Sequence, residues 1–213
     1  MSAWLNNYKV EAFQRFWRWA TLAGCIDANS RRAKEFAHFG QGSLLLFPMA
    51  ALFNEKYIEI GRNTMLGPYS SLSAGMMPGQ IMLGSPVLKI GDRCSIGRSS
   101  SIVAHLSVEI GDDVWTGPNV YITDQNHDYT DITRPIGAQS MPERAVSIGS
   151  NSWLGTNVVV LPGVRIGRHV TIGASSVVVD DIPDYSVAVG SPARVVRRYD
   201  LDRGEWISVA TEP

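Results

Sequence analysis

Histidine is the residue type in this chain best suited to proton transfer near neutral pH, because an imidazole has an unperturbed pKa of about 6.5. The chain contains four: His38, His105, His127 and His169. His127 lies in a polar segment, residues 123–129 (TDQNHDY), with carboxylates on both sides. A histidine placed there is suited to removing the proton of an attacking hydroxyl, which typically raises a rate by about 10²–10⁴-fold.

Charge and cysteine content indicate which kinds of partner and which cellular compartment to expect. Nineteen basic and twenty acidic residues give a net charge of -1, which lacks the basic footprint of a nucleic-acid-binding protein; we expect a small molecule or another protein as partner. Cys25 and Cys94 show no pairing pattern, which favours a reducing compartment. The sequence has neither a signal-peptide pattern nor an apolar run of about 18 residues, so we expect a cytoplasmic protein without stable membrane insertion.

The elements that position His127 are indicated by an internal repeat. Aliphatic residues recur every six positions at Ile148, Leu154, Val160, Ile166, Ile172 and Val178. Small or β-branched residues precede each of them by two positions, at Val146, Ser152, Val158, Val164, Val170 and Ser176. Because positions two apart on a strand share a face, both members of each pair can point inward.

A period of six residues fits neither an α-helix nor simple alternation, but it fits a short strand followed by a sharp corner. Three such strands would close a triangular coil of about eighteen residues, stacked on the next coil by parallel ladders. Glycine follows the aliphatic position at Gly149, Gly155, Gly167 and Gly173, and we expect it at corners because it adopts conformations that other residues resist. The sequence thus predicts an all-β parallel β-helix with an N-terminal helix; spacing alone does not give its hand.

The ladder also recurs earlier in the chain and is interrupted twice. It is visible at Ile60, Leu66, Leu72, Ile90, Ile96, Ile102, Ile110, Thr116 and Ile122. The interruptions, residues 73–87 and 123–145, are predicted to be loops extruded from the prism, and such loops commonly carry function. We therefore expect a β-helix domain over residues 41–198, after a helical segment 1–40 and before a C-terminal tail 199–213.

His127 is the only histidine that this arrangement predicts in an extruded loop. His38 falls in the helical segment, whereas His105 and His169 each stand three residues after an aliphatic position, at what we expect to be exposed corners.

The N-terminal segment reads as an amphipathic helix, since Val10, Phe13, Trp17 and Ala20 recur at spacings of three and four. Gly24 and residues 27–30 suggest a break and a second N-cap. Aromatic residues are concentrated in it, at Trp4, Phe13, Phe16, Trp17 and Trp19. We expect them to pack against the protein's own body; the alternative is a surface that touches a membrane or a partner.

Residues 147–197 read SIGSNSWLGTNVVVLPGVRIGRHVTIGASSVVVDDIPDYSVAVGSPARVVR. This run resembles the hexapeptide acyltransferases, in particular the branch of galactoside, maltose and nodulation-factor O-acetyltransferases, and the resemblance extends over roughly residues 58–198. It implies a left-handed β-helix and a homotrimer with active sites in the grooves between neighbouring prisms. It also implies transfer of an acetyl group from acetyl-CoA to a hydroxyl of a saccharide-type acceptor, directly and without a metal.

The resemblance also implies roles for individual residues. His127 matches the family's general base, and the backbone amide of Thr156 matches a donor near the thioester, where an oxyanion develops. Trp153 matches a residue that lines the pantetheine arm. The other positions that match coenzyme A contacts are Ala174, Val179, Arg194 and Arg197. Candidates for contact with the acceptor are Asn126, Asp124, Met141 and His105, and Met76 and Met77 could form another wall.

The chain departs from the family in two places. Val179-Asp180 stands where sugar acetyltransferases often have Thr-Lys, so an anion replaces a cation near the nucleotide end of coenzyme A. Gly97 and His105 stand where the galactoside enzyme presents an asparagine and an aspartate to its sugar, which predicts a different acceptor.

Three alternatives compete with this prediction, and the histidine spacing argues against one of them. An N-acyltransferase of an amino sugar, or a transferase of a longer acyl chain, would keep His127 and coenzyme A. A gamma-class carbonic anhydrase needs two histidines about five residues apart, a spacing that this chain lacks. A non-catalytic scaffold is the third.

Overall fold

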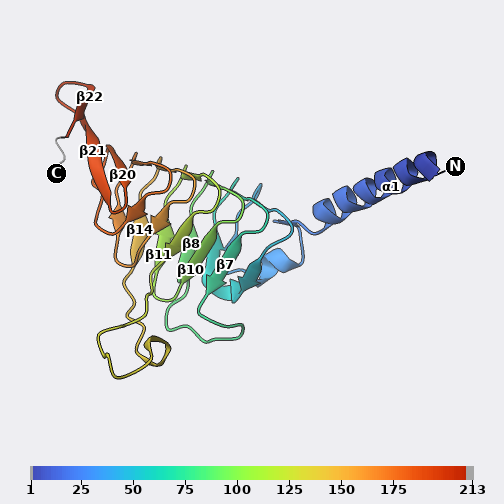
Figure 1. Cartoon of the computed structure of the whole chain (residues 1–213), viewed down its shortest axis with the longest axis horizontal. Helices are drawn as coiled ribbons and strands as arrows, with labels where there is room; N and C mark the ends of the chain where they lie inside the picture. Colours follow the sequence, from blue (N-terminus) through green and yellow to red (C-terminus); the bar gives the residue numbers. More distant parts are fainter. Residues whose placement is uncertain (1, 210–213) are drawn as a thin grey trace.

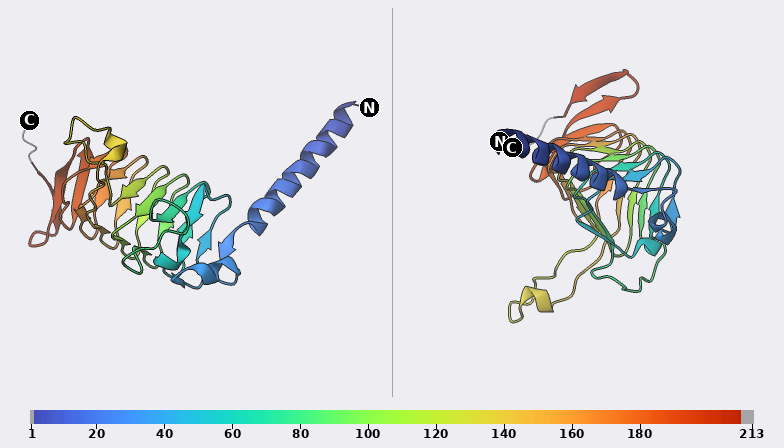
Figure 2. Two further views of the ribbon diagram at one scale, coloured as in Figure 1. Left: turned by 90° about the horizontal axis from the view of Figure 1, so that it is seen from below. Right: turned by 90° about the vertical axis from the view of Figure 1, so that its right-hand side faces the viewer.

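The computed structural model describes residues 2–209, with side chains from Tyr8 onward. Three sheets form the walls of a triangular prism whose coils are stacked along one axis (Figures 1 and 2). Wall A contains β1 (Ile26–Asp27), β3 (Leu44–Leu45), β6 (Met65–Leu66), β9 (Ser95–Ile96), β12 (Trp115–Thr116), β15 (Trp153–Leu154), β18 (Thr171–Ile172), β20 (Ser186–Gly190), β21 (Ala193–Asp200) and β22 (Glu205–Ser208).

The other two walls contain six strands each. Wall B contains β2 (His38–Phe39), β5 (Ile58–Ile60), β8 (Leu88–Ile90), β11 (Val108–Ile110), β14 (Val146–Ile148) and β17 (Arg165–Ile166). Wall C contains β4 (Ala51–Phe53), β7 (Ser71–Ala74), β10 (Ser101–Ala104), β13 (Tyr121–Thr123), β16 (Val159–Val160) and β19 (Val177–Val178). Short 3-10 turns lie at η1 (Arg32–Glu35), η2 (Glu55–Tyr57) and η3 (Ile136–Ala138).

The six-residue ladder is the core of the prism. Parallel pairing aligns Ile122 with Ile102 on the coil before it and with Val160 on the coil after it. All three side chains are at most 1% exposed, and the other aliphatic residues of the ladder from Ile148 to Val178 are at most 2% exposed. Because the strands from β1 to β19 are only two to four residues long, stability comes from pairing with neighbouring coils.

The glycines at the corners serve close packing between coils. Gly149, Gly155, Gly167 and Gly173 do not have positive φ, contrary to the expected reason for glycine at these positions. A Cβ on Gly149 would lie 2.5 Å from the backbone carbon of Gly167 on the next coil. The left-handed conformation falls two residues later instead, for example at Asn151, where φ is 62°.

The prism begins earlier than residue 41. Helix α1 (Ser2–Ala23) ends before Gly24, and no second helix longer than η1 follows in the described chain. β2, which contains His38, already pairs in parallel with β5, so the expectation of a helical segment to residue 40 is wrong. The first coil escapes the pattern because its buried or half-buried apolar residues, Phe39, Leu45 and Leu52, are spaced by six and then seven.

The aromatic residues of α1 do not pack on the body of the protein. The helix projects beyond the end of the prism (Figures 1 and 2). Phe13 and Trp19 are each 64% exposed, which contradicts the expected packing. Trp4 lies outside the residues whose side chains are described.

The C-terminal residues continue wall A. β20, β21 and β22 form an antiparallel meander, so β21 runs past residue 198, and residues 205–208 are a strand where we expected a tail.

The two loops leave the prism along one edge. The first connects β7 to β8 over residues 75–87, and the second connects β13 to β14 over residues 124–145; both therefore join wall C to wall B (Figure 1).

The glycine spacing generates a stability test. Gly149→Ala should lower the free energy of unfolding by about 1–3 kcal/mol, because the added methyl group forces two coils apart. Gly137→Ala is the matched control, since a Cβ there has no atom within 4 Å. Denaturant unfolding of both variants measures the difference, and equal midpoints would contradict the packing role.

Candidate active site

A cavity of about 340 Å³ lies on wall C beneath the two loops. It is lined by Phe53, Ser73, Gly75, Met76, Val103, His105, Tyr121, Thr123, Gln125, Asn126 and His127. Two of the four histidines, together with amide and hydroxyl groups, therefore face one space. A concave space that combines apolar side chains with several hydrogen-bonding groups suits the binding of a small molecule.

Strand register builds the floor of this cavity. Phe53, Ser73, Val103 and Thr123 occupy equivalent positions on four consecutive strands of wall C. Phe53, Val103 and Tyr121 were not among the site residues predicted from the sequence. The signal was available, because stacked coils place equivalent strand positions in one row.

The second loop is pinned across its base, and this pinning positions His127. The N–H of Asn126 donates to the carbonyl of Pro142 at 3.3 Å, and the N–H of Asp128 donates to the carbonyl of Ser140 at 2.9 Å. His127 lies between these paired residues, and its N–H donates to the side chain of Asn126 at 2.9 Å. Its exposed ring makes no hydrogen bond or ion pair with any described residue, so its nitrogens are available to a ligand.

The carboxylate of Asp128 makes hydrogen bonds within the loop and none with the imidazole of His127. The backbone N–H and the hydroxyl of Thr130 donate to Asp128 Oδ1 at 3.0 and 2.8 Å. These hydrogen bonds hold the pKa of the Asp128 carboxyl below its usual value. The group therefore stays ionised and stabilises the turn that follows His127.

Asp124, which we expected to contact an acceptor, is a structural residue. Its side chain is fully buried. Its carboxylate accepts hydrogen bonds from the backbone N–H groups of His105, Leu106 and Ser107, at 2.9, 2.7 and 2.8 Å. The prediction of acceptor contact is therefore wrong for this residue, because every direction of approach is occupied by protein.

His105 is buried, where we expected an exposed corner. It is 8% exposed, and its Nδ1 lies 3.4 Å from Glu143 Oε1 on the returning limb of the second loop. β10 extends through Ala104, so the chain has not yet turned outward at this position. His105 therefore forms part of the cavity wall, whereas His169 is exposed at a corner.

The methionines lie at the rim. Met76 of the first loop lines the cavity, but Met77 does not. Met141 does not line it directly; its sulfur accepts a hydrogen bond of 2.7 Å from Gln125 Nε2. Gln125 in turn lines the cavity, so Met141 supports a wall residue.

The residues expected to contact coenzyme A lie elsewhere, along the corner between walls A and C. Thr156 and Ala174 occupy this corner on consecutive coils, where the N–H of Ser175 donates to the carbonyl of Thr156 at 2.8 Å. The backbone N–H groups of Thr156 and Ala174 donate no hydrogen bond within the described chain. They are two preorganised donors without a partner.

Trp153 lies on wall A beside this corner. It is 53% exposed and pairs in register with Trp115, which is 61% exposed. The two indoles give wall A an apolar surface.

Near the C-terminal end of the prism, Arg194 is already paired. Its Nη1 donates to Asp180 Oδ2 at 2.9 Å, and Val179 beside it is 40% exposed. The guanidinium of Arg197 donates to the carbonyl of Trp206, at 3.4 Å, and pairs with no carboxylate of the described residues. Asp180, the acidic residue that departs from the family pattern, therefore neutralises Arg194, one of the two arginines expected to bind phosphate.

The residues around His127 and the residues expected to contact coenzyme A do not lie together within one chain. The cavity that holds His127 contains neither Thr156 nor Trp153 nor Ala174. His127 and Thr156 therefore lie on different edges of the prism.

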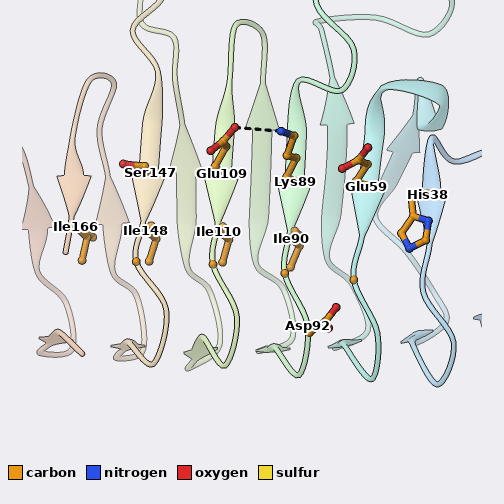
Figure 3. A pocket seen from close by; sticks show the side chains of 14 residues that line it. His38, Glu59, Lys89, Ile90, Asp92, Glu109, Ile110, Ser147, Ile148 and Ile166 are labelled. Atoms are coloured by element: carbon orange, nitrogen blue, oxygen red, sulfur yellow. Dashed lines mark hydrogen bonds and ion pairs between the residues drawn. The ribbon is translucent and has the colours of Figure 1, made fainter. Parts of the chain in front are cut away.

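A second cavity, of about 460 Å³, lies on the outer face of wall B (Figure 3). It contains His38, which stands on β2 and not in a helix. Its charged side chains include Glu59, Lys89 and Glu109, and Lys89 Nζ lies 3.4 Å from Glu109 Oε1. It has no residue of either loop and is a charged strand surface.

The described residues contain neither a metal-binding cluster nor a membrane-spanning helix. Over residues 8–209, no three His, Cys, Asp or Glu side chains are grouped so that they could hold a metal ion. No helix in the described part of the chain is long and apolar enough to cross a membrane.

A parallel β-helix with extruded loops is the fold of hexapeptide-repeat transferases, and comparison with known proteins agrees. Residues 145–180 match the bacterial transferase hexapeptide (six repeats), and residues 87–124 match the hexapeptide repeat of succinyl-transferase. The chain is 33% identical over 160 residues to a putative lipopolysaccharide biosynthesis O-acetyl transferase of Escherichia coli, covering 72% of this chain and 78% of that protein. The chain belongs to the hexapeptide-repeat acetyltransferase family, which confirms the predicted family and the left-handed β-helix.

Two further proteins are similar. A probable acetyltransferase of Mycobacterium tuberculosis is 40% identical over 144 residues, which cover 68% of this chain but only 45% of that protein's length. A solved structure of a maltose O-acetyltransferase from Clostridium difficile is 28% identical and superposes with a TM-score of 0.51, covering 78% of this chain and 71% of that one.

The burial of Asp124 generates a prediction. Asp124→Ala should lower the free energy of unfolding by at least about 3 kcal/mol, because three N–H groups lose their acceptor and each costs about 1–3 kcal/mol. Asp131→Ala, in the same loop, is the control, since that carboxylate only serves a local turn with Thr133. Thermal unfolding measures both, and similar losses for the two variants would refute the role of Asp124.

Proposed function

We propose that this chain is an acetyl-CoA-dependent O-acetyltransferase that modifies a hydroxyl of a saccharide. The observation that carries the proposal is the cavity that gathers His127, His105 and Asn126 beneath the two loops. Membership of the hexapeptide-repeat family, whose similar members include O-acetyltransferases, supports it.

His127 acts as general base. Its free ring accepts the proton of the acceptor hydroxyl as the oxygen attacks the carbonyl carbon of the thioester. The C–O bond forms, the C–S bond breaks, and the proton held by His127 passes to the departing thiolate. Neither cysteine takes part: Cys94 is buried, and Cys25 lies near the base of α1.

The corner between walls A and C receives acetyl-CoA in this proposal. The free N–H of Thr156 is a donor for the oxyanion that develops on the thioester, and the free N–H of Ala174 is a donor for the pantetheine arm. Trp153 covers the arm, while Val179, Arg194 and Arg197 lie toward the nucleotide. Arginine suits phosphate because its donors match the phosphate oxygens in pairs.

The acceptor is bound on wall C. Asn126 and His105 offer hydrogen-bonding groups, and Met141 acts through Gln125. Since His105 is held beside Glu143, it presents a fixed group to the acceptor.

A homotrimer completes the site. Wall A has exposed apolar side chains, Trp115, Trp153 and Met65, whereas wall B has charged ones. Packing wall A of one chain near wall C of the next would bring Thr156 to the His127 cavity. Because the two surfaces differ, the contact is heterologous and a threefold rotation closes it into a ring. The free thiols of Cys25 and Cys94 are consistent with a cytoplasmic location.

The direct test is His127→Ala. We expect turnover of acetyl-CoA to fall by at least about 10²-fold, because the base is lost while the remaining groups stay in place. The assay follows release of free thiol with a panel of mono- and oligosaccharide acceptors.

The control for this variant is sedimentation equilibrium together with acetyl-CoA binding, both of which should be unchanged. An unchanged rate would remove His127 from the mechanism. Thiol release with amine acceptors alone would replace O-transfer by N-transfer.

The pair between Asp180 and Arg194 gives a second test. Asp180→Asn should free Arg194 and lower the KM for acetyl-CoA about two- to fivefold at low salt, the range expected from an exposed ion pair. Arg194→Ala should raise this KM. Added salt should shrink both effects. The matched control is Asp184→Asn, which weakens the exposed pair with Arg168 at the corner between walls B and A; an equal change in that variant would contradict the assignment.

A further inference from the structure

Helix α1 presents aromatic side chains that the proposed reaction does not use. Phe13, Phe16, Trp17 and Trp19 are between 47% and 64% exposed. Their rings pair along the helix: Phe13 stacks on Trp17 at 6.4 Å between centroids, and Phe16 lies 5.9 Å from Trp19. The helix extends from the N-terminal end of the prism, and neither loop reaches it (Figures 1 and 2). A contiguous exposed aromatic patch of this kind marks an interaction surface.

Charge is distributed unevenly between this end and the rest of the chain. Residues 1–38 contain six basic and three acidic residues, whereas residues 39–213 contain thirteen basic and seventeen acidic residues. On α1 itself, Lys9, Arg15 and Arg18 stand against a single acid, Glu11. The aromatic helix therefore lies at the positive end of a chain whose remainder is negative.

Over residues 11–19, polar and aromatic side chains occupy different faces of the helix. Glu11, Gln14, Arg15 and Arg18 line one shallow hollow on its surface. Phe13 and Trp17, four residues apart, lie on a common face away from it. A basic polar face opposite Trp and Phe is the pattern of helices that lie in a membrane interface.

We propose that α1 docks in the plane of an anionic lipid surface. The aromatic rings insert at the level of the headgroups, where tryptophan is favoured, and the basic side chains meet anionic headgroups. The helix lies on the surface and does not cross it, because four charged residues fall within residues 9–18. This docking goes beyond the proposed reaction and does not depend on it.

The width of the aromatic face favours a lipid over a second copy of the helix. At 3.6 residues per turn, Trp17 and Trp19 project about 160° apart. A helix-to-helix seam uses a narrow stripe of two positions in seven. A helix that lies half immersed in a membrane interface contacts lipid over an arc of about this width.

The test is co-sedimentation of the full chain with vesicles. We expect binding to phosphatidylcholine vesicles that contain phosphatidylglycerol, weaker binding as salt rises, and little binding to phosphatidylcholine alone. Arg15→Glu with Arg18→Glu should weaken partitioning at least about tenfold, since each basic residue contributes about fivefold. Phe13→Ser with Trp17→Ser should also weaken it at least about tenfold, because it removes two inserted rings.

The matched control is Arg165→Glu with Arg203→Glu, which makes the same charge change on the body of the protein and should leave vesicle binding within about twofold of the unmodified chain. All variants should retain the thermal unfolding of the prism and any thiol release in solution. If the unmodified chain fails to bind anionic vesicles, or if both charge reversals weaken binding equally, the proposal is wrong. It is also wrong if Phe13→Ser with Trp17→Ser dissociates an assembly in sedimentation velocity while vesicles bind nothing, because α1 then contacts a second copy.

Discussion

Parallel hydrogen bonding between stacked coils is the constraint on which the rest of this molecule depends. Each strand of two to four residues gains its order from the coils on either side, as Ile122 does from Ile102 and Val160. The coils approach so closely that Gly149 leaves no room for a Cβ. Extra residues can therefore be inserted only where the chain leaves the ladder of paired strands. Both loops leave it at the edge between walls C and B.

The same constraint produces the two kinds of chemical group that the proposed reaction needs. Within a strand, backbone N–H groups are consumed by the neighbouring coil, but at the corner the N–H groups of Thr156 and Ala174 stay free. At the loop edge, the buried carboxylate of Asp124 closes the turn after β10, and the paired limbs of the second loop hold His127 above wall C. Donors and base arise on different edges of the prism, which is why the proposed function includes a neighbouring chain.

The period of six predicted the prism and the loop with His127, since a strict ladder leaves few alternatives for its fold and its interruptions. The six-residue period gave wrong positions where the length of a strand differs from that of its neighbours. His105 was assigned to a corner because it follows Ile102 by three residues, but β10 is longer than its neighbours on walls A and B and carries His105 into the cavity. The first coil was missed because its spacing of six and then seven breaks the period. Neither the pairing of Asp180 with Arg194 nor the burial of Asp124 leaves a periodic signal, because each depends on contacts between different coils.

The two histidines of the cavity have different surroundings, which argues for different roles under the proposed function. The ring of His127 has no partner within the described chain, so it is free to receive and release a proton as the acceptor and the thiolate exchange places. The ring of His105 lies beside Glu143 and is buried, which fixes its orientation. A general base must form a new contact in the transition state, whereas a residue that selects an acceptor must be rigid before the acceptor arrives. Under the proposed function, a histidine in place of the family's aspartate would change the shape and donor pattern of the acceptor wall while leaving His127 unchanged.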